Sequence, residues 1–329
     1  MLLEVKGLKT NFYTSRGVVP AVNDVSFSLD EGRVLAIVGE SGSGKSVTAM
    51  SIIRLVSKPG KTDAGEILFE GRDILKMTPS EVRALRGQKI SVIFQEPMTS
   101  LNPVMTCGAQ VKEVLQVHKK GMSKEAMNQR VIELFELVGI PDAERRMKEF
   151  PYQLSGGMRQ RVMIAIALAC EPKLLIADEP TTALDVTIQA QILDLLRDLQ
   201  KKMNMAILLI THDLGVVAEM ADDVIVMYGG SVQESGTVEQ VLHIPIHPYT
   251  LGLINSIPTL DGDGKNTEGR LNCIRGTVPS LINLPPGCVF CPRCDYVTDR
   301  CKVERPPLLD ISGGRRIACW QKTGEREDG

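Results

Sequence analysis

The chain has 329 residues, of which 43% are hydrophobic and 24% are charged, and its formal net charge is −2. This composition is typical of a soluble globular protein, excludes a disordered or collagen-like chain, and offers no broad basic surface for nucleic acid as the main partner. The first residues show no basic stretch followed by an apolar stretch, so we expect no signal sequence, and no apolar run approaches the roughly 18 residues of a membrane span. We therefore expect a cytosolic chain of about two domains that does not itself cross a membrane.

Four short apolar runs are typical of strands that are buried on both faces of a parallel sheet. They cover residues 34–38, 90–94, 174–177 and 206–210. Each run is followed at once by a polar segment: 39–46, Gln95-Glu96, Asp178-Glu179 and Thr211-His212-Asp213. Ligands of open parallel α/β sheets bind outside the carboxyl ends of the strands, so we expect these four segments to meet in one active site.

The segment after the first run fits the phosphate-binding P-loop pattern, and a helix-compatible run over 47–55 follows it. Glycines let the backbone N–H groups face a phosphate, and the helix N-terminus adds partial positive charge. Lys45 is expected to reach the β- and γ-phosphates, and the Ser46 hydroxyl to bind Mg²⁺. The predicted nucleotide-binding residues here are Gly39, Ser41, Gly42, Ser43, Gly44, Lys45, Ser46 and Val47. The alternative is a glycine-rich turn with an exposed lysine.

The region 97–169 is predicted to be mainly helical and to form an insertion in the α/β core. Within it, Ser155, Gly156 and Gly157 precede an apolar helix over 162–169. Serine is a good N-cap, and the two glycines allow an anion to approach that helix end. Taken alone, this segment predicts no more than a capped helix.

Two adjacent acids, Asp178 and Glu179, follow the third apolar run. Asp178 is a candidate Mg²⁺ ligand, and Glu179 is a candidate to polarise the water that attacks a γ-phosphate. Adjacent strand residues point to opposite sides, which suits separate roles for the two carboxylates. A solvated strand exit is equally typical of the pair alone, but the P-loop upstream favours the functional interpretation.

The cysteines are concentrated at the C-terminus, beyond helical patterns at 238–242 and 249–254 and a polar linker at 261–266. Six of the eight lie in the last 57 residues: Cys273, Cys288, Cys291, Cys294, Cys301 and Cys319. In a reducing cytosol, clustered cysteines more often hold a metal than form disulfides. The tail has few large apolar residues, so a metal would replace the core that it lacks. The spacing is compatible with zinc, with an iron–sulfur cluster and with unligated thiols.

The segment Ser155-Gly156-Gly157-Met158-Arg159-Gln160, between a P-loop and an Asp-Glu strand end, resembles the signature of ABC-type ATPases. Other elements of that family's cassette are also present. Gln95 matches the Q-loop, Ala183-Leu184-Asp185 the D-loop, His212 the switch histidine, and Phe12 or Tyr13 the aromatic residue that stacks on adenine. The resemblance covers about residues 1–240 and implies an α/β P-loop ATPase core with a parallel sheet over 1–96 and 170–240, interrupted by a helical subdomain over 97–169.

The resemblance also implies roles for particular residues. Two such domains associate head to tail, with ATP between the P-loop of one and the signature segment of the other. The residues expected to act across that dimer are Ser155, Gly156, Gly157, Gln160 and Asp185. Mg²⁺ is expected on Ser46, Gln95 and Asp178, and the expected catalytic residues are Glu179, His212 and Gln95. A degenerate regulatory cassette is disfavoured because Lys45, Asp178, Glu179 and His212 are intact. An exposed loop histidine is the alternative interpretation of His212.

Beyond the cassette, the segment that contains His247-Pro248-Tyr249-Thr250 and residues 284–294 are similar to the C-terminal region of ATPase subunits of bacterial oligopeptide and dipeptide importers. Residues 94–103, which flank Gln95 within the cassette, also resemble that subfamily. The similarity implies a peripheral protein at the cytoplasmic face of the membrane. Its partners would be two permease subunits, a homologous ATPase (or a second copy in isolation) and, indirectly, an extracytoplasmic binding protein. Nickel importers belong to the same subfamily. A soluble ABC ATPase acting on ribosomes or nucleic acid is the other alternative, which the net charge disfavours.

The tail pattern of this subfamily matches Cys288, Cys294, Cys301 and Cys319, which implies that these four thiols ligate a [4Fe–4S] cluster. Cys291 has no counterpart in that pattern and is the alternative ligand, and zinc is the alternative metal. Residues 241–329 are accordingly expected to form a C-terminal extension whose cysteine-rich, metal-binding part is a separate module.

Overall fold

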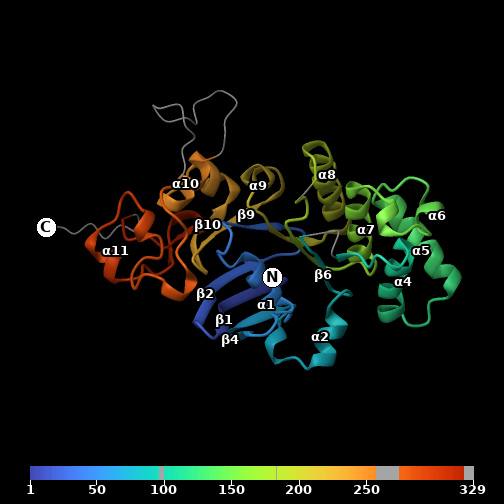
Figure 1. The fold of residues 1–329 in the computed structure, drawn as a ribbon, viewed down its shortest axis with the longest axis horizontal. Helices are drawn as coiled ribbons and strands as arrows, with labels where there is room; N and C mark the ends of the chain where they lie inside the picture. Colours follow the sequence, from blue (N-terminus) through green and yellow to red (C-terminus); the bar gives the residue numbers. More distant parts are fainter. Residues whose placement is uncertain (96–99, 183, 257–273, 322–329) are drawn as a thin grey trace. The chain divides into compact units, whose positions relative to one another are not determined.

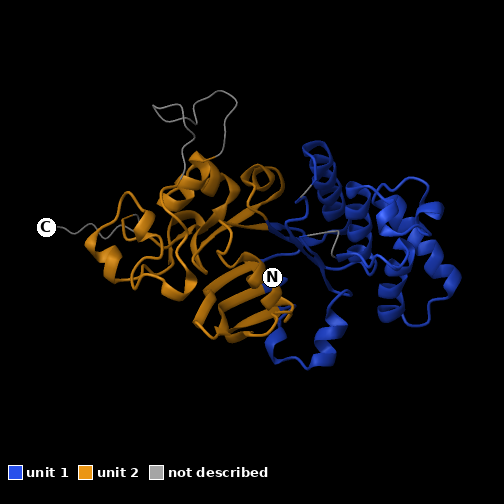
Figure 2. Cartoon of the chain, viewed as in Figure 1, with its two compact units in different colours: residues 1–3, 29–34, 69–210 blue, residues 4–28, 35–68, 211–329 orange. Residues whose placement is uncertain are grey.

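The computed structural model describes residues 1–95, 100–182, 184–256 and 274–321 (Figure 1). The chain divides into two compact units, which Figure 2 colours separately. Unit 1 comprises residues 1–3, 29–34 and 69–210, and unit 2 comprises residues 4–28, 35–68 and 211–329. Each unit thus combines segments that are distant in the sequence. Among the described residues, no helix has the length and apolar character needed to cross a membrane.

Three parallel strands lie side by side in unit 1: β6 (Ile90–Ile93), β7 (Leu174–Asp178) and β8 (Ala206–Ile210). The register places Ala177 of β7 between Ile93 of β6 and Leu209 of β8. Every residue of β7 and β8 is buried. Unbroken apolar runs form such strands because both faces of the sheet are covered. These three predicted strands are confirmed, with ends that differ by at most one residue.

The helices of unit 1 are α2 (Pro79–Leu85), α4 (Cys107–His118), α5 (Lys124–Leu137), α6 (Ala143–Arg146), α7 (Gly156–Leu168) and α8 (Val186–Met203). Short elements are β5 (Arg72–Asp73) and the 3₁₀ turns η1 (Ile74–Lys76) and η2 (Pro151–Gln153). Helix α5 contacts α4, α6 and α7 (Figure 1). The side chains of Thr106 and Ser123 cap α4 and α5. The helical prediction for 97–169 is confirmed over the described residues.

Unit 2 contains two groups of strands. β1 (Leu3–Thr14) lies between β2 (Gly17–Leu29) and β4 (Gly60–Phe69). β9 (Asp223–Tyr228) pairs in parallel with β3 (Val34–Val38), the first predicted strand, and antiparallel with β10 (Ser231–Thr237). β9 is a further strand of the buried kind that our sequence analysis missed, although its apolar run after Asp223 carries the same signal.

The helices of unit 2 are α1 (Lys45–Ile52), α9 (Leu214–Met220), the π-helix η3 (Glu239–His243), α10 (Pro248–Asn255) and α11 (Asp299–Val303). Short 3₁₀ turns are η4 (Leu281–Asn283), η5 (Cys291–Arg293) and η6 (Ser312–Gly314). The helical patterns at 238–242 and 249–254 therefore correspond to η3 and α10.

The C-terminal residues 274–321 share a core with the sheet of unit 2. β12 (Arg316–Ile317) pairs with β10 and with β11 (Leu309–Asp310). Val289 and Phe290 are buried in one apolar cluster with Val226 and Tyr228 of β9. We expected a separate module, but these bulky side chains fill space against β9 and make the tail part of the unit. The expected linker at 261–266 lies outside the described residues.

Candidate nucleotide site

The P-loop connects β3 to α1 and is held closed by its own lysine. The Lys45 side chain is buried, and its Nζ donates to the carbonyl oxygens of Gly39 at 2.7 Å and Glu40 at 3.1 Å. The Ser43 hydroxyl is also buried and has no hydrogen-bond partner in the described protein. Ser41, Gly42 and Ser46 are exposed and Val47 is half-buried. These features suit a loop that binds phosphate: a buried lysine, a serine hydroxyl that lacks a partner, and exposed residues at the turn.

Two glycines of this loop have no possible substitute. Gly39 and Gly44 have φ values of 148° and 101°, which side chains disfavour. A Cβ on Gly39 would lie 2.1 Å from the carbonyl oxygen of Met227, and one on Gly44 would lie 2.2 Å from that of Ala21. Both neighbours are backbone atoms and cannot turn aside. The loop therefore needs glycine for its conformation and for its close packing against other backbone.

His212 lies in a pocket beside the P-loop. It follows the buried Thr211, is itself exposed, and lines a pocket of about 320 Å³ together with Gly39 and Glu40. Leu253 and Ser256, from the end of α10, line the same pocket. Unit 2 thus brings the predicted switch histidine and the P-loop together, with the C-terminal region at their side.

Glu179 lies just beyond β7 in unit 1, where two neighbours orient its carboxylate. Its Oε2 accepts hydrogen bonds from Nε2 of Gln95 and from the Thr182 hydroxyl, both at 2.8 Å. Its backbone N–H donates to the carbonyl oxygen of Ile210 at 2.8 Å. Unit 1 thus brings together two predicted catalytic residues, and Thr182 is a third contributor that our sequence analysis missed.

The separation of the two acids has a different origin from the one we expected. Asp178 is the last residue of β7 and is buried. Glu179 has left the strand, with a φ of 47° in the left-handed region. Strand alternation therefore does not set the orientation of the Glu179 side chain relative to that of Asp178.

The signature segment forms the start of α7. Ser155 is exposed and caps the helix, accepting a hydrogen bond from the Met158 N–H at 3.3 Å. A Cβ on Gly157 would lie 2.8 Å from Ile188, so α8 packs closely here. Gln160 is buried, and its amide donates to the carbonyl of Pro180 in the same unit. Its contact is thus within this chain, to the segment that follows Glu179.

Three other predicted residues have clear local settings. Asp185 is exposed and caps α8 through a 3.0 Å bond from the Ile188 N–H, while Ala183 lies outside the described residues. Phe12 is half-buried beside Gly60, whereas Tyr13 is half-exposed. The Tyr13 hydroxyl donates to Asp63 at 2.8 Å, and this hydrogen bond raises the pKa of the tyrosine. The choice between the two aromatics for adenine stacking stays a prediction, as does the meeting of all four strand-end segments in one site.

The P-loop also contacts residues that sequence analysis did not identify. Arg293 forms an ion pair with Glu40, at 2.6 Å between Nη1 and Oε2. The hydroxyl of Tyr249 accepts a hydrogen bond from the Glu40 N–H at 2.9 Å. These partners are more than 200 residues from Glu40 in the sequence, so no local pattern could have indicated the contacts.

Five cysteines of the described tail line one small, mainly apolar cavity of about 20 Å³, beside His247 and Trp320. They are Cys288, Cys291, Cys294, Cys301 and Cys319. All cysteines in the described part of the chain are free, and burial raises the pKa of the Cys288 thiol to about 12. Within the described ranges, no three His, Cys, Asp or Glu side chains are arranged to hold a metal ion. The cavity has room for about one water, so a cluster would require the thiols to shift.

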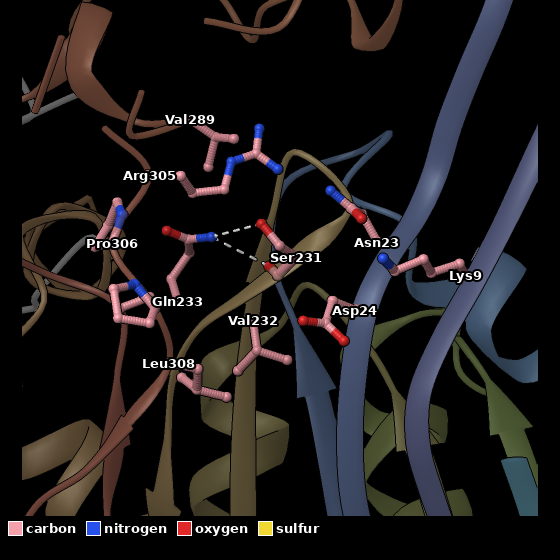
Figure 3. A pocket seen from close by; sticks show the side chains of 12 residues that line it. Lys9, Asn23, Asp24, Ser231, Val232, Gln233, Val289, Arg305, Pro306 and Leu308 are labelled. Carbon is pink, nitrogen blue, oxygen red and sulfur yellow. Dashed lines mark hydrogen bonds between the residues drawn. The ribbon is translucent and has the colours of Figure 1, made fainter. Parts of the chain in front are cut away.

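Another pocket of unit 2, of about 310 Å³, lies between residues of β1, β2, β10 and the C-terminal segment (Figure 3). Gln233 donates there to the hydroxyl of Ser231 at 3.0 Å. Arg305 lines the pocket beside Val289 (Figure 3). The described residues that line it include none of the predicted nucleotide or cysteine residues.

Two protein families match this chain, one in its N-terminal part and one in its C-terminal part. Residues 22–182 match the ABC transporter family, and residues 233–301 match the family described as oligopeptide/dipeptide transporter, C-terminal region. The chain is 55% identical over 320 residues to the oligopeptide transport ATP-binding protein AppD of Bacillus subtilis, covering 97% of this chain and 96% of that protein. It is 50% identical over 319 residues to OppD of Haemophilus influenzae, covering 97% of each.

Solved structures agree with this relationship. The dimeric, post-hydrolysis structure of the ATP-binding cassette MJ0796, bound to ADP and Pi, has a TM-score of 0.65 and 29% sequence identity. The match covers 72% of this chain and 99% of that one. The described fold is therefore the P-loop fold of ABC ATPases. The chain belongs to the ATP-hydrolysing, ATP-binding subunits of ABC transporters, in the branch that carries the oligopeptide/dipeptide transporter C-terminal region.

Proposed function

We propose that this ATPase powers the uptake of di- or oligopeptides through a membrane importer. The observation that carries the proposal is the similarity over 97% of the chain to oligopeptide transport ATP-binding proteins, which extends through the C-terminal region at 233–301. A cassette alone would be expected to match only the first part of the chain. The shared C-terminal region therefore points to the transport branch rather than to a soluble ABC ATPase.

The proposed reaction uses residues from both units. Lys45 and the P-loop amides would bind the phosphates, and Ser46, Gln95 and Asp178 would hold Mg²⁺, which offsets charge on the phosphates. Glu179 would accept a proton from the attacking water as the new O–P bond forms. The bond from the γ-phosphorus to the bridging oxygen then breaks, and ADP leaves. His212 would contact the γ-phosphate from the pocket that it shares with Gly39.

The proposed assembly contains two permeases, a homologous ATPase and an extracytoplasmic binding protein. In it, the chain lies against the cytoplasmic face of the membrane. Ser155, Gly156, Gly157 and Asp185 would face the nucleotide of the partner ATPase, and the exposure of Ser155 and Asp185 leaves them accessible for this role. We propose an ATPase core at 1–96 and 170–240, a helical subdomain at 97–169 and a C-terminal extension at 241–329.

The function is tested in proteoliposomes that contain the chain, its permeases and the partner ATPase, with the binding protein outside. We expect ATP-dependent accumulation of a labelled peptide, abolished when Glu179→Gln replaces the wild-type chain. Labelled Ni²⁺ is the parallel substrate. Uptake of Ni²⁺ without uptake of peptides would contradict peptide import while leaving the ATPase assignment in place.

We also propose that Cys288, Cys294, Cys301 and Cys319 hold a [4Fe–4S] cluster, with zinc as the alternative metal. Support comes from the donor set: these thiols line one cavity, and Cys288, Cys301 and Cys319 are buried. Thiolates are the usual ligands of such clusters, and ligation would offset the high pKa that burial confers on Cys288. When bound, the cluster would supply covalent cross-links between the residues on either side of η5, α11 and the last described residues.

Single serine substitutions distinguish the ligand sets. Cys319→Ser is expected to remove most of the iron and acid-labile sulfide from anaerobically purified protein, because each thiolate of a cluster is required for its stability. Cys291→Ser is the matched control, expected to retain both. Iron, zinc and sulfide analysis and the visible absorption spectrum are the measurements. Colourless wild-type protein with zinc and without iron would exclude the cluster, and iron loss only in Cys291→Ser would reverse the assignment.

A further inference from the structure

One P-loop residue, Glu40, is held by the C-terminal region at both its side chain and its backbone. The Arg293 guanidinium meets the carboxylate with two hydrogen bonds, at 2.6 Å from Nη1 to Oε2 and 3.1 Å from Nη2 to Oε1. Such paired bonds restrict orientation as well as distance. The Glu40 N–H donates to the hydroxyl of Tyr249 at 2.9 Å. The carbonyl oxygen of the same residue accepts the bond from Lys45. Glu40 therefore connects the C-terminal region to Lys45, the lysine proposed to bind the phosphates.

Arg293 uses its whole donor set in this position. Its Nε donates to the carbonyl oxygen of Arg275 at 2.8 Å. In addition to their bonds to Glu40, Nη2 donates to the carbonyl oxygen of Ile274 at 3.4 Å, and Nη1 donates to the hydroxyl of Tyr228 at 3.3 Å. With the two bonds to Glu40, these contacts account for all five N–H groups of a guanidinium. The side chain is only 4% exposed. A lysine could not reproduce this arrangement because its ammonium has three donors on one nitrogen.

The surroundings of this ion pair are rigid. Tyr228, Tyr249 and Phe290 form a buried aromatic group, with ring centroids 4.6 to 5.3 Å apart. The hydroxyls of the two tyrosines contact Arg293 and the Glu40 N–H respectively. Aromatic rings packed in this way resist displacement because they fill the core at close contact. The ion pair thus joins the P-loop to packed structure and not to a loose side chain.

Arg293 also belongs to the turn at residues 291–294, which we call the cysteine-lined turn because Cys291 and Cys294 are its first and last residues. It ends η5, which begins at Cys291, and Cys294 follows it directly. The backbone N–H of Arg293 donates to the carbonyl oxygen of Phe290 at 2.9 Å. The backbone N–H of Cys294 donates to the carbonyl oxygen of Cys291 at 3.4 Å. Any rearrangement of this turn therefore moves the guanidinium that holds Glu40.

We propose that Arg293 is a positioning residue for the P-loop, through which the cysteine-lined turn at 291–294 sets the affinity for ATP. The turn holds Arg293, Arg293 holds Glu40, and Glu40 fixes the carbonyl that accepts from Lys45. The proposal rests on the P-loop as the nucleotide site. Because binding energies are linked, ATP must in turn stabilise this arrangement of the cysteine-lined turn.

The first test measures the Kd for ATP with Mg²⁺ on the full chain, at a concentration too low for turnover to deplete ATP. Arg293→Gln is expected to weaken binding by about 5- to 20-fold, and Arg293→Lys to rescue it only partly. Glu40→Gln should weaken ATP binding to a similar extent. The double variant that combines Arg293→Gln and Glu40→Gln should weaken it no further, because all three variants break the same Arg293–Glu40 ion pair. Arg305→Gln is the matched control in the same segment, with wild-type Kd expected. Thermal unfolding of each variant identifies loss of fold.

The reciprocal test measures alkylation of Cys291 by mass spectrometry, with and without a non-hydrolysable ATP analogue and Mg²⁺. The analogue is expected to slow labelling of the wild-type chain at least about threefold, and to have no effect in Glu40→Gln at saturating analogue. This readout does not depend on hydrolysis, and it remains informative if Arg293→Gln does not fold.

The possible outcomes test the coupling between the cysteine-lined turn and the P-loop separately from the proposed ATP site itself. If the wild-type chain binds ATP and Arg293→Gln has the same Kd, the coupling is excluded. Additive losses in the double variant, or equal labelling of Cys291 with and without analogue, exclude it as well. A wild-type chain that fails to bind ATP would overturn the nucleotide site and the coupling together.

Discussion

Replacing Glu179 with glutamine is expected to lower the rate of ATP hydrolysis by about 10²- to 10⁴-fold, the usual contribution of a general base. Glutamine has the same shape and retains an oxygen to accept hydrogen bonds from Gln95 and Thr182, which now meet at one carboxylate oxygen. The substitution removes the negatively charged carboxylate, which is the base that would accept the proton from water. The P-loop residues that we propose bind the phosphates are unchanged, so ATP affinity should change less than about threefold.

Phosphate release and ATP binding should be measured on the same preparations. Glu171→Gln is a suitable control, because the Glu171 side chain is 64% exposed and pairs with Arg130 at the surface of the same unit. It should hydrolyse ATP at the wild-type rate. Hydrolysis that persists in Glu179→Gln at more than about a tenth of the wild-type rate would assign the base to another residue.

Replacing Lys45 with alanine is expected to raise the Kd for ATP by about 10- to 100-fold. The side chain is 6% exposed and is held at two loop carbonyls, so its ammonium is already confined near the place where the loop would receive the phosphates. Loss of a charged hydrogen-bond donor at a buried phosphate site costs about 1.5–3 kcal/mol. The two carbonyls would also lose their donor, and a lower thermal stability should accompany the weaker binding.

The comparison variant is Lys61→Ala, since the Lys61 side chain is 72% exposed on β4 and pairs only at the surface with Asp63. Its Kd for ATP and its unfolding temperature should match those of the wild-type chain. Equal ATP affinity in Lys45→Ala and wild type would show that the inward lysine serves the fold of the loop and not the nucleotide.

Much of the nucleotide site could be predicted because its elements are local. Gly39 and Gly44 stand at fixed spacing between an apolar strand and a helix, and the structure shows why each must be glycine. The strand that precedes Gln95 and the strand that ends at Asp178 can be recognised as apolar runs, since both faces of a parallel sheet are buried. Ser155 could likewise be recognised as a helix cap from its neighbours alone.

Other features could not be predicted because they depend on contacts between distant segments. Thr182 joins Glu179 only because the backbone reverses at a φ of 47° directly after β7. The tail shows the same limit: its prolines and cysteines suggested a segment without a core, whereas Val289 and Phe290 complete the core of β9.

The sequence by itself determined the ATPase cassette of this protein, the order of its motifs and the residue types of the P-loop, because these follow from spacing along one strand, loop or helix. Only the tertiary structure decided what holds the P-loop from outside. Arg293 and Glu40 are 253 positions apart, and their pairing depends on the packing of the tail against β9, which brings the guanidinium within 2.6 Å of the carboxylate. A local pattern cannot encode such a meeting, since the five guanidinium donors find their acceptors at Glu40, Tyr228 and residues 274–275, which are distant in the sequence.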